Sequence, residues 1–175
     1  MKLKGKKIAI LIEHHYQDME VWYPYYRLTE EGAEVIMAGT GTAASYSGKY
    51  GYPAGADADA KNLKAKNLDA VVVPGGWAPD FLRRHDSVLN LVREMDAAGK
   101  TVAAICHAGW VLASAGILKG RTVTCFSAIK DDVINAGGKY VDKEVAVDGN
   151  LITSRTPDDL PAFCREIISS LAGKK

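Results

Sequence analysis

The sequence predicts an α/β fold in which a mostly parallel sheet lies between two layers of helices, with residues 1–175 forming a single domain. Three observations support this prediction. Short apolar runs, typical of strands buried on both faces, alternate with helical patterns along nearly the whole chain. Gly149-Asn150 separates two late strand-like runs, which predicts an antiparallel hairpin at one edge of the sheet. A sharp turn at Cys106 joins a strand to a helix.

In the first half of the chain, the predicted strands are apolar runs over 8–12, 33–39 and 69–74. A helix is expected to begin near Asp18, which can cap its first turn, and to end at Gly32. A break is expected at Pro24, because proline disrupts a regular helix interior. Residues 40–67 are rich in Gly, Ala, Tyr and Asp and have no long period, so loops with one or two short strands are expected there.

In the second half, the predicted strands cover 102–105, 122–125 and two runs within 143–154. The predicted helices have apolar residues at helical spacing and cover 87–99, 110–115, 129–138 and 156–171. Thr156 followed by Pro157 and two acidic residues is a helix start, because it combines a hydroxyl cap, a first-turn proline and carboxylates that complement the helix dipole.

Composition and charge are those of an ordinary globular protein: 47% of the residues are hydrophobic, 25% are charged, and the formal net charge is +1. This balance predicts neither a nucleic-acid nor a membrane partner. The apolar run behind the basic start is too short for a signal peptide, and no segment reaches transmembrane length. Three widely spaced cysteines, Cys106, Cys125 and Cys164, fit neither a disulfide framework nor a zinc site, so a cytoplasmic location is expected.

Cys106 is the candidate nucleophile. Four apolar residues run directly into it, and Ala104 and Ala108 are small enough to allow a tight turn around it. Its sulfur is expected near the first N–H groups of the following helix, whose partial positive charge favours the thiolate. The alternative is a buried, inert cysteine at the end of a core strand, which is how Cys125 and Cys164 are interpreted.

A glutamate and two glycines are expected beside this cysteine. In parallel sheets, functional residues gather beyond the carboxyl ends of the strands, so one crevice is predicted to hold segments 13–20, 75–76 and 106–107. A buried Glu20 can stay protonated and donate a hydrogen bond to a thiolate, whereas the alternative is a solvated glutamate at a helix start. Gly75 and Gly76 can offer backbone N–H groups to an oxyanion, together with the His107 N–H, or they form an ordinary turn.

His107 directly follows the nucleophile, so in a sharp turn its ring is expected to point away from the sulfur and to be oriented by a third group. Asp80 is a candidate acid for that task. A long distance within one subunit would place this contact between neighbouring molecules. The alternative is that Asp80 only caps the short helix that follows it.

Glu13, His14 and His15 form a further polar cluster at the same end of the predicted sheet. Adjacent histidines point in different directions, and no Cys or Asp at metal-ligand spacing accompanies them. The sequence therefore predicts no metal site, and it predicts no cofactor.

Several motifs together resemble the PfpI intracellular protease family of the wider ThiJ/PfpI superfamily: AAICHAG, PGGWAPD, EVWYPYYRL, IKDDVINAGG, AVDGN and SRTPDDLPAF. The resemblance implies a flavodoxin-like α/β/α sandwich with Cys106 as nucleophile, His107 beside it and Glu20 in contact with the thiol. It also implies that Asp80 stands where the family places an acid, usually glutamate, that reaches the histidine across a subunit interface. Dimers or hexamers would then be active.

Several positions depart from the family pattern, among them His14-His15, which replaces a more acidic loop. Family members commonly read Cys-His-Gly-Pro, where this chain has Ala108-Gly109 after the histidine. Many have tyrosine where this chain has Phe126, and Asp80 is one methylene shorter than glutamate. These departures leave the nucleophile intact and bear on the substrate.

The leading functional hypothesis is a cysteine-dependent hydrolase. Deglycase or glyoxalase-like activity on small dicarbonyls and on glycated proteins or peptides, in stress protection, is preferred over an intracellular peptidase, because the fold implies a small pocket. The alternative, from another class, is a redox sensor or chaperone in which Cys106 is oxidised to sulfinic acid and nothing is turned over.

Overall fold

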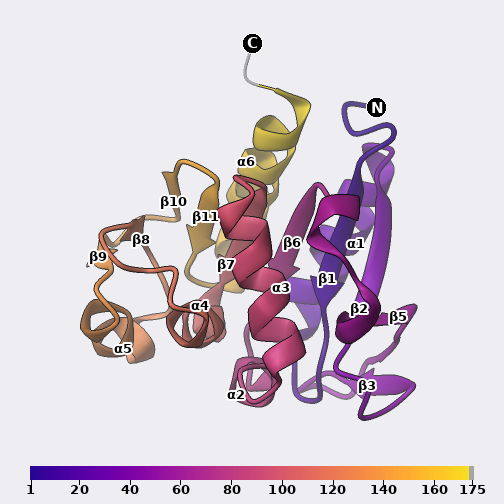
Figure 1. Ribbon diagram of the computed structural model, residues 1–175, viewed down its shortest axis with the longest axis horizontal. Coiled ribbons are helices and arrows are strands. Elements are labelled where there is room, and N and C mark those ends of the chain that lie inside the picture. The colour runs from indigo at the N-terminus through magenta and orange to yellow at the C-terminus, as the bar shows by residue number, and fades with distance from the viewer. Residues whose placement is uncertain (174–175) are drawn as a thin grey trace.

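The computed structural model describes residues 1–173 and contains a seven-stranded sheet with the order β10-β11-β7-β6-β1-β2-β5 (Figure 1). Its strands are β1 (Lys7–Leu11), β2 (Glu34–Gly39), β5 (Ala58–Asp59), β6 (Ala70–Val73), β7 (Thr101–Ile105), β10 (Val145–Asp148) and β11 (Leu151–Ser154). Neighbouring strands are parallel except in the β10–β11 hairpin. Two small ladders lie outside this sheet: β3 (Ser45–Ser47) with β4 (Pro53–Gly55), and β8 (Thr122–Val123) with β9 (Lys139–Tyr140).

The helices are α1 (Asp18–Glu30), α2 (Ala78–Leu82), α3 (Asp86–Ala97), α4 (Gly109–Ala115), α5 (Lys130–Asn135) and α6 (Leu160–Ala172). Helices α1 and α6 pack together on one face of the sheet, while α2, α3 and α4 pack together on the other face (Figure 1). The predicted three-layer α/β arrangement with a late edge hairpin is therefore confirmed.

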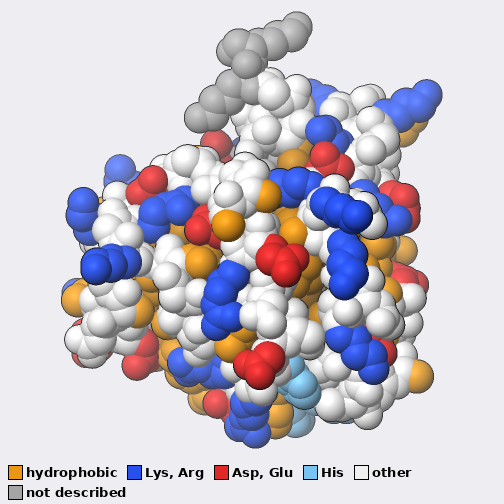
Figure 2. All heavy atoms as spheres, viewed as in Figure 1, with side chains coloured by type: hydrophobic (Ala, Val, Ile, Leu, Met, Phe, Trp, Pro, Cys, Tyr) orange, Lys and Arg blue, Asp and Glu red, His pale blue; other side chains and the backbone are white. Residues whose placement is uncertain are grey.

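The core lies on both faces of the central strands. All four residues of β6, Ala70–Val73, have no exposed surface, and the strands β1 and β7 beside it are almost completely buried. Burial on both faces explains why these strands read as continuous apolar runs rather than as alternating patterns. Among residues 1–173, no helix is both long and apolar enough to cross a membrane. Acidic and basic side chains are interspersed over the face that carries α3 (Figure 2).

Two local predictions about α1 are wrong. The helix runs without interruption through Pro24, because proline removes only one intrahelical bond while Val21 and Leu28 bury the same side of the helix. The N-cap is Gln17, whose side chain accepts a hydrogen bond from Met19 N at 2.9 Å, rather than Asp18.

The order of the strands explains where polar loops meet. From β1 the chain moves outward through β2 and β5, and it then returns to build β6, β7 and β11 on the other side of β1. The boundary between β1 and β6 is therefore a topological switch point, where a crevice opens at the carboxyl ends of parallel strands. The loops that follow β1, β6 and β7 lie at this end.

Candidate active site

Cys106 stands at the corner between β7 and α4. Its φ of +61° lies in the left-handed region, which is uncommon for a residue other than glycine and is typical of a tight functional turn. A single 3-10 turn over Cys106–Ala108 then leads into the helix. The cysteine is only 7% exposed, so little of it is open to solvent.

The loop after β1 is bonded to the loop after β6. The N–H of Gln17 donates to the Gly75 carbonyl at 3.1 Å, and the N–H of Trp77 donates to the His15 carbonyl at 2.9 Å. Gly76 has a φ of +71°, and a Cβ there would lie 2.5 Å from Gln17 N. This close backbone approach requires glycine, and it fixes the start of α1 against the crevice.

Glu20 is the buried acid of the crevice, with no exposed surface. Its Oε2 accepts a hydrogen bond from Gly75 N at 2.6 Å, whereas Oε1 has no hydrogen-bond partner among the described residues. A Cβ on Gly75 would lie 2.6 Å from Oε2 and 3.0 Å from the Cys106 sulfur, so the carboxyl group and the sulfur both border this glycine. The Gly75 N–H is thus bonded to Glu20 in this structure, and its part in an oxyanion hole stays a prediction.

Burial makes Glu20 a proton carrier near neutral pH. Desolvation disfavours the carboxylate and raises the pKa of Glu20 to about 7, although the Gly75 N–H, the Cys106 side chain and the charge of Lys49 act in the opposite direction. A large fraction of molecules therefore holds a neutral Glu20 at neutral pH, with a proton to donate.

N–H groups near the helix start favour the thiolate as predicted, but the net pKa of the Cys106 thiol is raised. Burial raises that pKa to about 12, and the negative charge of Glu20 is the second cause. The backbone N–H groups of Gly76 and His107 favour the thiolate but do not outweigh burial. Protonation of Glu20 removes the repulsive charge, so the sulfur ionises more readily when Glu20 is neutral.

The orientation predicted for His107 is also wrong. Its ring turns toward the sulfur, with Nδ1 3.2 Å from Sγ of Cys106. Burial lowers the pKa of His107, and the positive charge of Lys49 adds to this shift, so the neutral imidazole is favoured. A neutral ring at this distance is placed to take the thiol proton.

Asp80 lies on α2, and its carboxylate pairs with Arg84, four residues later and just beyond the end of that helix. Among residues 1–173, no hydrogen bond joins Asp80 to His107. The structure therefore brings Cys106, His107 and Glu20 together within one chain and leaves Asp80 outside that group.

Two residues of the polar cluster that follows β1, Glu13 and His14, form hydrogen bonds with neighbouring loops and strands. Glu13 is buried and accepts hydrogen bonds from the side chains of Thr40 and Thr42, while His14 Nδ1 accepts from Ser47 N at 3.2 Å. Across residues 1–173, no group of three or more His, Cys, Asp or Glu side chains is arranged to hold a metal ion.

Two neighbours of the site were not identified from the sequence. Trp110 lies three residues after His107, a helical spacing that could have indicated contact between the rings. Lys49 comes from the segment between β3 and β4, and nothing in the sequence connects it to the crevice. Its charge nevertheless acts on both Glu20 and His107.

Comparison with known proteins identifies the family. The DJ-1/PfpI family matches residues 6–170. The chain is 43% identical over 165 residues to a protein of Pyrococcus horikoshii named deglycase PH1704, covering 94% of this chain and 99% of that one. It is 38% identical over 167 residues to the Bacillus subtilis protein named putative cysteine protease YraA, covering 95% and 99% of the two chains.

A solved structure agrees with these relatives. A two-domain protein from Anabaena variabilis, with DJ-1/ThiJ/PfpI-like and ferritin-like domains, superposes with a TM-score of 0.94 at 43% identity. The match covers 95% of this chain but 48% of that one, so this chain spans about half the length of the Anabaena protein. The family predicted from the sequence motifs is confirmed: the chain belongs to the DJ-1/PfpI family.

Proposed function

We propose that the chain is a cysteine-dependent hydrolase that removes dicarbonyl adducts from glycated molecules. The observation that carries the proposal is the placement of the Cys106 sulfur beside both a buried acid and a neutral imidazole, 3.2 Å from His107 Nδ1. Relatives of nearly the same length, 43% identical, are named deglycases. A thiol, a base and a proton donor in one crevice match that chemistry.

The first step is attack by Cys106. In an adduct of methylglyoxal, the carbon that bears the hydroxyl group is bonded to a nitrogen or sulfur atom of the glycated molecule. The Cys106 sulfur displaces that atom, which leaves with the proton that His107 takes from the thiol. Because burial opposes a free thiolate, loss of the thiol proton to Nδ1 accompanies the attack.

The second step is an internal proton rearrangement followed by hydrolysis. The proton on the attacked carbon moves to the adjacent carbonyl carbon, and the hydroxyl proton moves to the oxygen of that carbonyl group, which gives a thioester on Cys106. Glu20 is the nearby group with a pKa suited to carrying these protons. Water then hydrolyses the thioester to a hydroxy acid and the free thiol. The N–H groups of Gly76 and His107 are the donors proposed for the developing oxyanion.

The test is the decay of methylglyoxal adducts of N-acetylarginine and N-acetylcysteine. The wild-type protein and a Cys125→Ser control should remove the adducts and release the hydroxy acid, while Cys106→Ser should leave them decaying at the rate of buffer alone. Equal decay with the wild type and Cys106→Ser would remove the hypothesis. Selective peroxide oxidation at Cys106 without turnover would favour the redox sensor instead.

A peptidase is the second candidate, supported by the relative named putative cysteine protease. The low exposure of Cys106 favours a small adduct over a folded polypeptide, since a peptide chain must reach a sulfur that is only 7% exposed. Incubation with denatured casein and with short fluorogenic peptides separates the two. Cleavage that requires Cys106, with no loss of adducts, would favour the peptidase.

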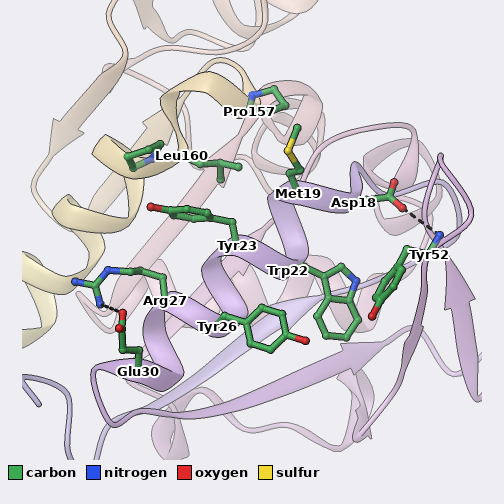
Figure 3. A pocket seen from close by; sticks show the side chains of 11 residues that line it. Asp18, Met19, Trp22, Tyr23, Tyr26, Arg27, Glu30, Tyr52, Pro157 and Leu160 are labelled. Carbon is green, nitrogen blue, oxygen red and sulfur yellow. Dashed lines mark hydrogen bonds and ion pairs between the residues drawn. The ribbon is translucent and has the colours of Figure 1, made fainter.

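We infer that the chain works as a dimer or hexamer in which Asp80 of one subunit approaches the His107 ring of another. The side chains of α1 that border a groove of about 840 Å³ support self-association (Figure 3). Met19 and Tyr26 in this groove are more than half exposed, at 55% and 60%, and Met19 directly precedes Glu20. Large exposed apolar patches of this kind mark interaction surfaces. Sedimentation velocity at micromolar concentration tests the assembly, and a monomer would contradict it.

A further inference from the structure

We propose that Phe126 and Trp110 form an aromatic clamp that holds the His107 ring on the Cys106 sulfur, and that Asp132 fixes Trp110 for this task. All three are positioning residues, because they act through His107. The inference rests on the proposed function only in taking His107 as the acceptor of the thiol proton.

Three aromatic rings lie against the imidazole, and besides the two rings of the clamp the Trp77 ring lies 5.6 Å from it at 46°. The Phe126 ring stacks on His107 with centroids 5.0 Å apart and an interplanar angle of 26°. The Trp110 ring meets it edge-on, at 5.2 Å and 71°. A stacked contact on one side and an edge contact on another limit how the ring can turn, and in the observed orientation Nδ1 lies 3.2 Å from the sulfur.

Phe126 is hydrogen-bonded to the backbone of the nucleophile, Cys106. Its backbone N–H donates to the carbonyl oxygen of Cys106 at 3.2 Å. The residue that stacks on the base is therefore bonded to the turn that presents the sulfur, so the base and the nucleophile share one rigid support.

Trp110 is held from two other elements. Its Nε1–H donates to Oδ2 of Asp132 at 3.0 Å, which ties α4 to α5. The guanidinium of Arg83 lies 5.9 Å from its ring centroid, and Arg83 Nε is fixed by a 2.9 Å hydrogen bond to Ser114 Oγ. These contacts set the tilt of the indole independently of His107.

In other cysteine and serine hydrolases an acid orients the histidine. The clamp orients the His107 ring from within one chain, beside the Asp80 carboxylate that we infer approaches it from another subunit. Within residues 1–173, the side chain of His107 has one hydrogen-bond partner, Cys106. The other charged groups around the ring are Lys49, whose charge acts on it directly, and Asp132 and Arg83, which reach it through Trp110. Aromatic packing also keeps water from the ring and favours its neutral, basic form.

The test compares Phe126→Leu with Phe126→Tyr, and Asp132→Ala with Asp131→Ala. Tyrosine preserves the stacked ring, and Asp131 is the neighbouring carboxylate of the first turn of α5, so each pair contains its own control. Two readouts are used: the pKa of His107 by NMR of labelled histidine, and the rate of Cys106 alkylation by iodoacetamide at neutral pH. Neither depends on hydrolysis of a glycated substrate.

Phe126→Leu should raise the His107 pKa toward its ordinary value of 6.5 and slow alkylation by about tenfold, because a misplaced base loses much of its effect. Asp132→Ala should shift both readouts in the same directions, while Phe126→Tyr and Asp131→Ala should stay within about twofold of the wild type. If Phe126→Leu does not fold, the comparison of Asp132→Ala with Asp131→Ala decides whether the clamp exists, because both aspartates are exposed and their loss should not unfold the chain. Unchanged or faster alkylation with an unchanged histidine titration in Asp132→Ala would overturn the clamp, whatever the outcome of the adduct assay.

Discussion

The Gly75 N–H donates a hydrogen bond to Oε2 of Glu20 at 2.6 Å, while Oε1 of the same carboxyl group is buried without a partner among the described residues. One oxygen is thus anchored by the backbone, and the other is available to carry a proton. We propose that this asymmetry holds an acid against the Cys106 sulfur and makes the reactivity of the sulfur depend on pH.

Replacing Gly75 should damage the site more than the fold. In Gly75→Ala, the new Cβ would lie 2.6 Å from Cys106 Cβ and from Glu20 Oε2, so both groups must move. We expect unfolding to become easier by about 1–3 kcal/mol and activity to fall by about a hundredfold. In the control Gly55→Ala, the added Cβ meets nothing within 4 Å, and both properties should be nearly unchanged. Equal effects of the two substitutions, measured by urea unfolding and adduct decay, would contradict this account.

Glu20 should weaken the fold as the pH rises. Its pKa is about 7 in the folded chain against 4.5 ordinarily, so between these values the folded state binds more protons and the free energy of unfolding falls with pH. At about 1.4 kcal/mol per pKa unit, the full loss is about 3 kcal/mol. In Glu20→Gln this loss is absent, and the variant should gain stability relative to the wild type between pH 5 and about 8. Urea unfolding of both proteins across this range gives the difference, which a Glu20 with an ordinary pKa would not produce.

The three cysteines should differ in reactivity. Burial raises the pKa of Cys125 and of Cys164 to about 12, and neither has a described histidine hydrogen bond comparable to that of Cys106. Limiting iodoacetamide at pH 7 should therefore modify Cys106 first, as peptide mapping would show. Modification of Cys125 or Cys164 at the same rate would mean that the neighbouring imidazole gives the sulfur no advantage.

Asp80 should matter for activity but little for stability. Its pair with Arg84 is surface-exposed, so Asp80→Ala should change the free energy of unfolding by less than about 0.5 kcal/mol. If Asp80 acts between subunits, mixing Asp80→Ala with Cys106→Ser under conditions of subunit exchange should restore activity that neither variant has alone. No recovery, in oligomers shown to be mixed, would exclude a role in trans.

Local patterns were sufficient to predict much of the fold. The buried strands, the hairpin at Gly149-Asn150 and the strand-to-helix turn at Cys106 each follow from a few consecutive residues. The break predicted at Pro24 is wrong because helix propensity is a local quantity, whereas the continuity of α1 depends on packing by Val21 and Leu28.

The features of the site that the sequence did not predict have a different origin. The direction of the His107 ring depends on the left-handed backbone of Cys106 and on stacking by Phe126, nineteen residues later in the sequence. The Gly75 N–H is used by Glu20, which lies far from it along the chain. The pKa of Cys106 depends on burial by surrounding elements. Each of these properties arises from tertiary contacts that no short motif encodes.

The central claim, that Glu20 controls the reactivity of Cys106, is tested most directly by the pH dependence of Cys106 alkylation in wild type and Glu20→Gln. Below pH 7 a neutral Glu20 adds no charge beside the sulfur, whereas above pH 7 its carboxylate opposes the thiolate. The account predicts that the wild-type rate stops rising near pH 7 while the variant continues to rise, so that the ratio of variant to wild-type rates increases above pH 7. A ratio that stays constant from pH 5 to pH 9 would contradict it.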